Sequence, residues 1–200
     1  TACCQLLTDI LESRKDVVHL ATRIKKCPVY ETSSFLLRLV QLDDAKDLLA
    51  CYSDRRAVAN MNADCCTSDF YYETLTQMQE CIRFWLREYQ QQAYIRFAII
   101  DKTVKKAVGT AEIFGGTLGG GLSGFGVLRI DLRPALRDRP PYSMKLFHSQ
   151  PIAGCRTLQF LFFIQKPGTR RQRIPVLEKH GFTASDTFRP GMGYYEKQQI

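Results

Sequence analysis

FGVLRIDLRPALRDRPPY, residues 125–142, is the stretch that decides how this chain folds. Apolar and polar side chains alternate from Phe125 to Leu132, which predicts a β-strand. Residues 142–150 have the pattern of a short helix, so the basic segment between them is a strand-to-helix turn. The N–H groups and the positive end of a helix dipole favour an anion at such a turn. The prolines of this turn, however, have no N–H to donate.

Further strands and helices are predicted on either side of this stretch. Strands are expected at residues 35–40, 94–101, 107–114, 125–132, 159–164 and 193–197. Helices are expected at residues 43–52 with Asp43 or Asp44 as N-cap, 54–60, 73–91, 142–150, and 174–180 with Pro175 in the first turn. Residues 115–124 are expected to be a glycine-rich linker. This order predicts a mixed α/β (α+β) layer domain, with residues 94–132 as an antiparallel meander.

Length and composition limit the class of protein. The chain has 200 residues and a net charge of +8, which suits one domain with a real core and favours acidic or phosphorylated partners. Residues 1–29 are expected to be a helical extension, and residues 30–200 the main domain. No apolar run reaches about 18 residues, so no membrane span is expected, and the first residues do not resemble a signal peptide. We therefore expect a cytoplasmic protein.

The cysteines and histidines give no strong motif. The eight cysteines are irregularly spaced and are expected to be reduced thiols, with a disulfide framework or a metal site as alternatives. The three histidines are scattered among helical segments, and nothing local suggests a catalytic triad.

Two further segments of the sequence are candidates for binding phosphate groups. GGGLSG, residues 119–124, has the spacing G-x-G-x-x-G, but it leads into a strand rather than a helix, which favours a hairpin loop. KPGTRRQR, residues 166–173, is basic and is either a solvated loop and helix start or a contact for phosphates. RNA binding through the basic runs is the weaker of these hypotheses, because few aromatic residues alternate with the basic ones.

Four segments, taken in order, carry a resemblance to a known family. They are YETSSFLLRL followed by LDDA (residues 30–39 and 42–45), KAVGTAEI (106–113), VLRIDLRP (127–134) and VLEKHGF (176–182). Over about residues 30–197 the chain resembles the GNAT superfamily of N-acetyltransferases, especially its ribosomal-protein and small-amine branch. The resemblance implies a mostly antiparallel, twisted sheet with helices on both faces. It also implies that the fourth and fifth strands splay apart and admit the pantetheine arm of acetyl-CoA.

The resemblance also implies which residues contact the co-substrate. The implied contacts are Leu132, Arg133, Arg137, Asp138, Arg139 and Tyr142. Arg137 matches the first position of the family's Arg/Gln-x-x-Gly-x-Gly/Ala loop, whereas Pro140 and Tyr142 stand at its small positions. Each N–H donor lost to the CoA phosphates is worth on the order of 1.5–3 kcal/mol. Side-chain contacts from the arginines would offset part of this loss.

Catalysis in this family transfers the acetyl group directly to a primary amine in a ternary complex. Glu112 and Asp131 are the candidate bases, and the alternation of side chains leaves open which of them faces the cleft. The late-helix position that carries a tyrosine in many members holds Leu177 here, so Tyr194 is the candidate acid for the leaving thiolate. The implied function is an acetyl-CoA-dependent N-acetyltransferase acting on a small molecule or a protein N-terminus, with residues 61–72 selecting the acceptor. The alternative is a GNAT-fold binding module that has lost acetyl transfer.

Overall fold

The computed structural model describes residues 27–58, 61, 69–91, 93–118, 122–133, 161–165, 170–179, 181–187 and 190–198. The expected N-terminal helices and the helix expected at residues 142–150 lie outside this described part. Within it, no helix has the length and apolar character needed to cross a membrane.

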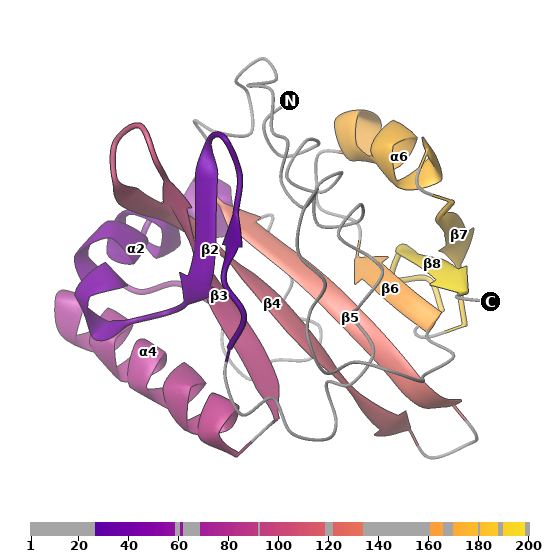
Figure 1. Ribbon diagram of the computed structural model, residues 1–200, viewed down its shortest axis with the longest axis horizontal. Helices are drawn as coiled ribbons and strands as arrows, with labels where there is room; N and C mark the ends of the chain where they lie inside the picture. The colour runs from indigo at the N-terminus through magenta and orange to yellow at the C-terminus, as the bar shows by residue number, and fades with distance from the viewer. Residues whose placement is uncertain are drawn as a thin grey trace.

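The described strands form one sheet in the order β1-β2-β3-β4-β5-β6-β8-β7 (Figure 1). Their bounds are β1 Tyr30–Glu31, β2 Phe35–Leu39, β3 Tyr94–Asp101, β4 Lys106–Leu118, β5 Leu122–Leu132, β6 Leu161–Gln165, β7 Thr183–Ser185 and β8 Tyr194–Gln198. Strands β3, β4 and β5 pair antiparallel, which confirms the predicted meander. Strands β5 and β6 pair parallel, while the other described pairs are antiparallel.

The glycine-rich segment was predicted wrongly as a linker. Strand β4 continues to Leu118 and β5 begins at Leu122, so most of residues 115–124 belongs to a long hairpin. Gly115 pairs with Gly126, and the register shifts by a bulge between Gly116 and Thr117. Strand pairing supplies the main-chain hydrogen bonds there and outweighs the low strand propensity of glycine.

The described helices are α2 Ala45–Tyr52, α3 Arg55–Val58, α4 Leu75–Gln90 and α6 Arg170–Lys179, with a 3-10 turn η1 at Leu42–Asp44. Thr74 caps α4 with a capping box, because its hydroxyl accepts from the Gln77 N–H and the Gln77 side chain accepts in return from the Thr74 N–H. Asp44 does not cap α2 as predicted; its carboxylate accepts from the Gln41 N–H and from Arg38. Helix α6 begins at Arg170 rather than near Ile174, since Pro175 removes only one donor from it.

Two apolar clusters lie on opposite faces of the sheet. Helices α2 and α4 cover one face through Leu48, Met78, Ile82 and Trp85, which pack against Ala98 of β3. The other face presents a cluster that includes Phe97, Ile99, Ala111 and Leu132. Helix α6 lies at the far end of the sheet, beside β7 and β8 (Figure 1).

Candidate functional site

Charged side chains cross three neighbouring strands in one row beneath α2 and α4. Glu112 of β4 is the register partner of Arg96 on β3 and of Arg129 on β5. Two residues away on each strand, Thr110 of β4 is the register partner of Asp131 on β5. Register partners point to the same face, so both carboxylates predicted from the sequence lie on the face that α2 and α4 cover.

Glu112 is held between two arginines. Arg129 donates to one carboxylate oxygen at 2.9 Å, and Arg96 donates to the other. The exposed fractions are only 2% for Arg96, 4% for Glu112 and 6% for Arg129. Buried charges need such pairing to offset their loss of hydration, so Glu112 has the geometry of a structural counter-ion.

Asp131 takes part in a second set of contacts, which involves helix α2. The Tyr52 hydroxyl donates to Asp131 Oδ2 at 3.2 Å and lies 2.7 Å from the Thr110 hydroxyl. Arg96 donates to the same Asp131 oxygen at 3.4 Å. Arg96 therefore joins the two carboxylates in one cluster, in which two arginines balance Glu112 and Asp131.

Aromatic rings enclose this cluster. The Arg96 guanidinium carbon lies 4.3 Å from the centroid of the Trp85 ring and 5.7 Å from that of Phe70. Phe70 has a left-handed backbone, with φ of 58°, a conformation that is unusual for a bulky residue. Burial raises the pKa of Tyr52 well above its ordinary value, and the charge of Asp131 adds to this effect. The pKa of Arg96 lies above its ordinary value: burial lowers it, but its interactions with Tyr52, Asp131, Tyr94 and Cys81 together raise it by more.

The described pairing of strands β5 and β6 ends next to this cluster. Their last described pair is Leu128 with Ile164, and β5 continues beyond it to Leu132. The Arg133 N–H donates to Val108 of β4 at 3.1 Å, so by strand alternation the main-chain groups of Ile130 and Leu132 are directed away from β4. The Leu132 side chain is buried in the core of the opposite face.

The predicted cofactor contacts are only partly described. Arg133 is half-buried, and its guanidinium donates to the main-chain oxygen of Asp47 on α2. The Arg133 Nε atom has no hydrogen-bond partner among the described residues. Arg137, Asp138, Arg139 and Tyr142 lie outside the described residues.

Tyr194 lies on the same face as the two carboxylates. Leu128 of β5 pairs with Ile164 of β6, so the next residue of each strand, Arg129 and Gln165, stands at the same height in the sheet. Gln165 in turn pairs with Tyr194 of β8. Partners in a sheet share a face, and the tyrosine is fully buried. The sheet therefore brings Glu112, Asp131 and Tyr194 to one face, with the carboxylates on β4 and β5 and the phenol on β8.

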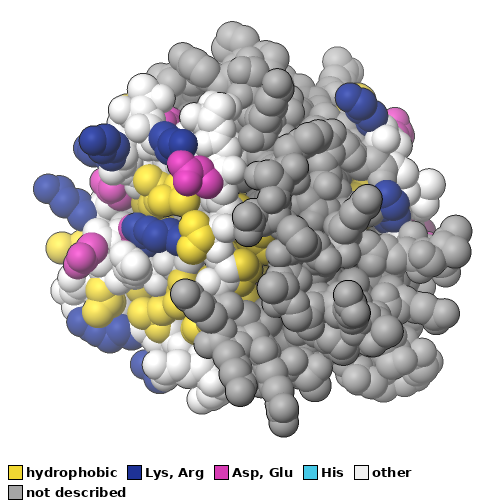
Figure 2. Space-filling model, viewed as in Figure 1, with side chains coloured by type: hydrophobic (Ala, Val, Ile, Leu, Met, Phe, Trp, Pro, Cys, Tyr) yellow, Lys and Arg dark blue, Asp and Glu magenta, His cyan; other side chains and the backbone are white. Residues whose placement is uncertain are grey.

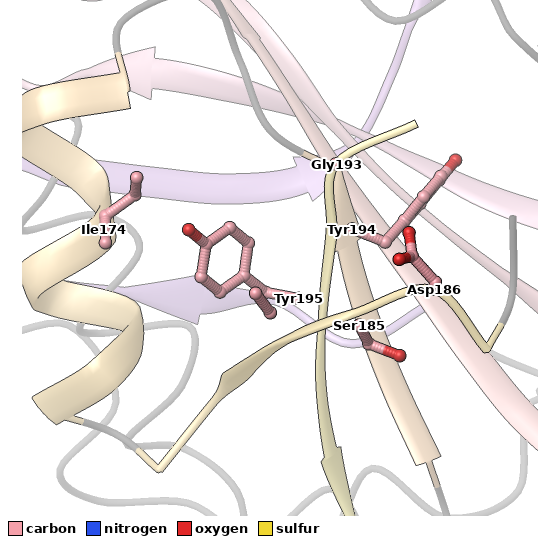
Figure 3. A pocket seen from close by; sticks show the side chains of 7 residues that line it. Ile174, Ser185, Asp186, Gly193, Tyr194 and Tyr195 are labelled. Atoms are coloured by element: carbon pink, nitrogen blue, oxygen red, sulfur yellow. The ribbon is translucent and has the colours of Figure 1, made fainter. Parts of the chain in front are cut away.

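A pocket of about 320 Å³ lies at the end of β7 and β8. Its lining residues are Ile174, Ala184, Ser185, Asp186, Gly193, Tyr194 and Tyr195. Figure 3 shows Tyr195 pointing towards Ile174 of α6, while Tyr194 points away to the other side of β8. Helix α6 therefore lies on the face opposite α2 and α4. Neither Glu112 nor Asp131 lines this pocket.

In Figure 2, the Lys and Arg side chains of the described residues lie among acidic, apolar and other side chains on the face shown. The side chains of the basic run at residues 166–173, the other candidate contact for phosphates, lie outside the described part. Within the described residues, Cys27, Cys51 and Cys81 form no disulfide, and the other five cysteines lie outside this part of the chain. Among the described residues, no group of His, Cys, Asp and Glu could hold a metal ion.

Sequence reasoning missed the partners of the two carboxylates. These are Tyr52, Arg96 and Arg129, while Thr110 bonds to Tyr52 and Arg96 in the same cluster. Arg96 gives the clearest signal in the sequence, because it interrupts an otherwise apolar strand, YIRFAII. A buried arginine needs carboxylate partners, and the neighbouring strands of the meander carry them.

No protein-family model matches the sequence, and a search of curated proteins finds no match. The fold, in contrast, is similar to that of solved GNAT acetyltransferases. The ribosomal-protein-S5-alanine acetyltransferase from Vibrio fischeri has a TM-score of 0.56 at 12% identity, over 86% of this chain and 96% of that one. RimL, a ribosomal L7/L12 alpha-N-protein acetyltransferase in complex with coenzyme A, has a TM-score of 0.55 at 10% identity, over 86% and 95%. Mycobacterium smegmatis RimJ in complex with CoA-disulfide has a TM-score of 0.55 at 12% identity, over 87% and 86%.

Proposed function

We propose that this chain is an acetyl-CoA-dependent N-acetyltransferase that acts on a primary amine. The observation that carries the proposal is that, in a GNAT fold, the described pairing of β5 with β6 ends beside Asp131 and level with Tyr194. Neighbours with this fold include coenzyme A complexes. The chain therefore combines a fold used for acetyl transfer with acidic and phenolic groups at the point where this pairing ends.

We place the pantetheine arm of acetyl-CoA beside β5, beyond its last described pair with β6. Ile130 and Leu132 direct main-chain N–H and C=O groups away from β4, and the amides of pantetheine can pair with such groups as a short strand would. We assign the phosphates to the loop that follows, with side-chain contacts from Arg133, Arg137 and Arg139. Asp138 and Tyr142 belong to the same proposed contact region.

The proposed reaction follows from these positions. The amine nitrogen forms a bond to the thioester carbonyl carbon, and the bond from that carbon to sulfur breaks. A carboxylate of this face, Asp131 or Glu112, takes the proton from nitrogen. Tyr194 gives a proton to the leaving thiolate and is reprotonated through water from the carboxyl group, so the products are an amide and a thiol.

The acceptor is proposed as a protein N-terminus or a small amine. Two neighbours act, by their names, on ribosomal protein S5 alanine and on the alpha-amino group of L7/L12. A peptide with a free N-terminal alanine and the polyamine spermidine are therefore the first acceptors to test.

A binding module without acetyl transfer is the second candidate. One observation favours it: both oxygens of Glu112 accept hydrogen bonds from buried arginines, which leaves this carboxylate poorly placed to take a proton. The prolines of residues 134–141 also remove main-chain donors from the proposed phosphate loop.

Calorimetry and a thiol-release assay test the two candidates. Wild-type protein is titrated with acetyl-CoA, with ATP as a polyanion control for the net charge of +8, and acetyl transfer is followed with the alanine peptide and with spermidine. Binding of acetyl-CoA and transfer would support the enzyme. Binding without transfer would favour the module, and absence of both would refute the enzyme. A Pro140→Gly/Tyr142→Gly variant should bind acetyl-CoA more tightly if the loop still contacts the phosphates.

A further inference from the structure

The two carboxylates of the buried cluster have different hydrogen-bond partners. Glu112 receives an arginine on each oxygen, with Arg129 at 2.9 Å on one side and Arg96 on the other. Taking up a proton there would remove the negative charge that lies between two buried positive charges. This cost makes Glu112 a counter-ion for the arginines rather than a proton acceptor.

Asp131 lies on the part of β5 that extends past its last described pair with β6. Its chain neighbours on either side, Ile130 and Leu132, direct their main-chain groups away from β4 and so towards the proposed acetyl-CoA cleft. Asp131 is thus nearer to that cleft along β5 than the row formed by Glu112 and Arg129.

Tyr52 fixes the position of the Asp131 carboxylate. Its hydroxyl donates to Asp131 Oδ2 at 3.2 Å, and the Thr110 hydroxyl, 2.7 Å away, can donate to the phenol oxygen in turn. The Tyr52 ring packs against Tyr72 and Trp85, with ring centroids 6.0 and 5.7 Å away. A fully buried ring with neighbours on several sides cannot swing away from its partner.

We propose that Asp131 takes the proton of the amine, that Tyr52 is the residue that positions it, and that Glu112 only balances charge. This inference rests on the proposed acetyl transfer and assigns the base that was left open there. The N–H bond breaks as the carbon–nitrogen bond forms, and its proton goes to the Asp131 carboxylate. The electron pair of the broken carbon–sulfur bond stays on the thiolate, which takes its proton as described above.

This assignment predicts how kcat falls on the acid side of its pH profile, here called the acid limb. Asp131 must be ionised to take a proton, so kcat falls at low pH as its carboxylate is protonated. The groups of the described part that face it are Tyr52 on α2, Arg96 on β3, Glu112 on β4 and Arg129 on β5. The Tyr52 hydroxyl stabilises the ionised form, so its removal should move the acid limb to higher pH.

The test compares Tyr52→Phe with Tyr89→Phe in the full chain. Both changes remove one hydroxyl from a tyrosine that packs against the sheet, but Tyr89 packs against the cluster of the opposite face and its hydroxyl hydrogen-bonds the main chain of Cys27. With acetyl-CoA and the alanine peptide or spermidine, we expect Tyr52→Phe to lower kcat about tenfold, leave KM for acetyl-CoA unchanged and raise the midpoint of the acid limb. Tyr89→Phe should keep the wild-type profile.

Two carboxylate variants complete the test. Asp131→Asn should lower kcat by about 100-fold or more and remove the acid limb. Glu112→Gln should lower the urea midpoint while the acid limb remains. An unchanged acid limb in Tyr52→Phe, or its loss in Glu112→Gln, would overturn the inference while the proposed acetyl transfer stands. A wild-type protein that neither binds acetyl-CoA nor acetylates either acceptor would overturn both.

Discussion

Replacing Arg96 by methionine tests how the buried cluster stabilises the fold. Arg96 donates to Glu112 and Asp131, and its guanidinium packs on Trp85. The variant leaves two buried carboxylates with Arg129 as their one charged partner in the cluster. Removing one member of a buried ion pair costs about 3–5 kcal/mol. Methionine retains apolar contact with Trp85, so the lost stacking adds little to this cost.

Urea unfolding measures this loss. Trp85 is the single tryptophan of the chain, so its fluorescence reports on the cluster, while far-UV circular dichroism reports on the whole fold. At a slope of about 2.5 kcal/mol per molar urea, a loss of about 4 kcal/mol moves the midpoint down by about 1.6 M. Arg56→Met is the control, because the Arg56–Asp54 pair lies at the surface; its urea midpoint should stay close to that of the wild type.

A double-mutant cycle with Asp131→Asn shows whether charge balance is the cause. Each single variant leaves an unbalanced buried charge, whereas Arg96→Met/Asp131→Asn leaves the Glu112–Arg129 pair intact at 2.9 Å. The double variant should therefore lose about 1–3 kcal/mol less than the sum of the two single variants. Additive losses would refute charge balance as the reason, and so would a loss below about 1 kcal/mol in Arg96→Met.

Three further changes probe other parts of the molecule. Gly109→Ala would place a Cβ against the carbonyl oxygen of Asp131, so thermal unfolding should show a loss of about 1–3 kcal/mol; an unchanged melting temperature would contradict this. Thr74→Ala should cost about 1 kcal/mol in urea unfolding by removing the capping box of α4, whereas Thr76→Ala in the same exposed turn should cost nothing. Burial raises the pKa of the Cys27 thiol to about 12, against a hydrogen bond from the Leu39 main chain. Because the unfolded thiol ionises first, this contribution to stability is present below about pH 9 and is lost as pH rises towards 12. Cys27→Ala should flatten the alkaline fall of the urea midpoint, and an unchanged slope would contradict the assignment.

Long strands and helices were predictable because their side chains repeat with a clear period. The meander over residues 94–132 and helix α4 agree with the pattern of the sequence. Strands β1 and β7 were missed because they are two and three residues long, too short to show an alternation. They exist because a neighbouring strand offers unpaired main-chain groups. The continuation of β4 and β5 into the glycine-rich segment has the same cause.

The candidate site was predictable residue by residue but not as a cluster. Alternation alone identified Glu112 and Asp131 as strand carboxylates and left their face open. The bulge between Ile99 and Ile100 shifts the pairing of β3 with β4 by one residue, and no spacing in the sequence encodes it. Tyr52 was missed for another reason: its position in the apolar stripe of α2 is typical of an ordinary core residue.

Arg96 shows how the cluster could have been inferred from the sequence. A charged residue in the middle of an apolar strand either faces solvent or needs buried partners. The strand YIRFAII has apolar residues on both sides of Arg96, which indicates burial on both faces. The next two strands of the meander carry Glu112, Arg129 and Asp131, and the observed register places Glu112 opposite both arginines. Arginines therefore occupy both oxygens of Glu112, which is why we propose Asp131 rather than Glu112 as the base.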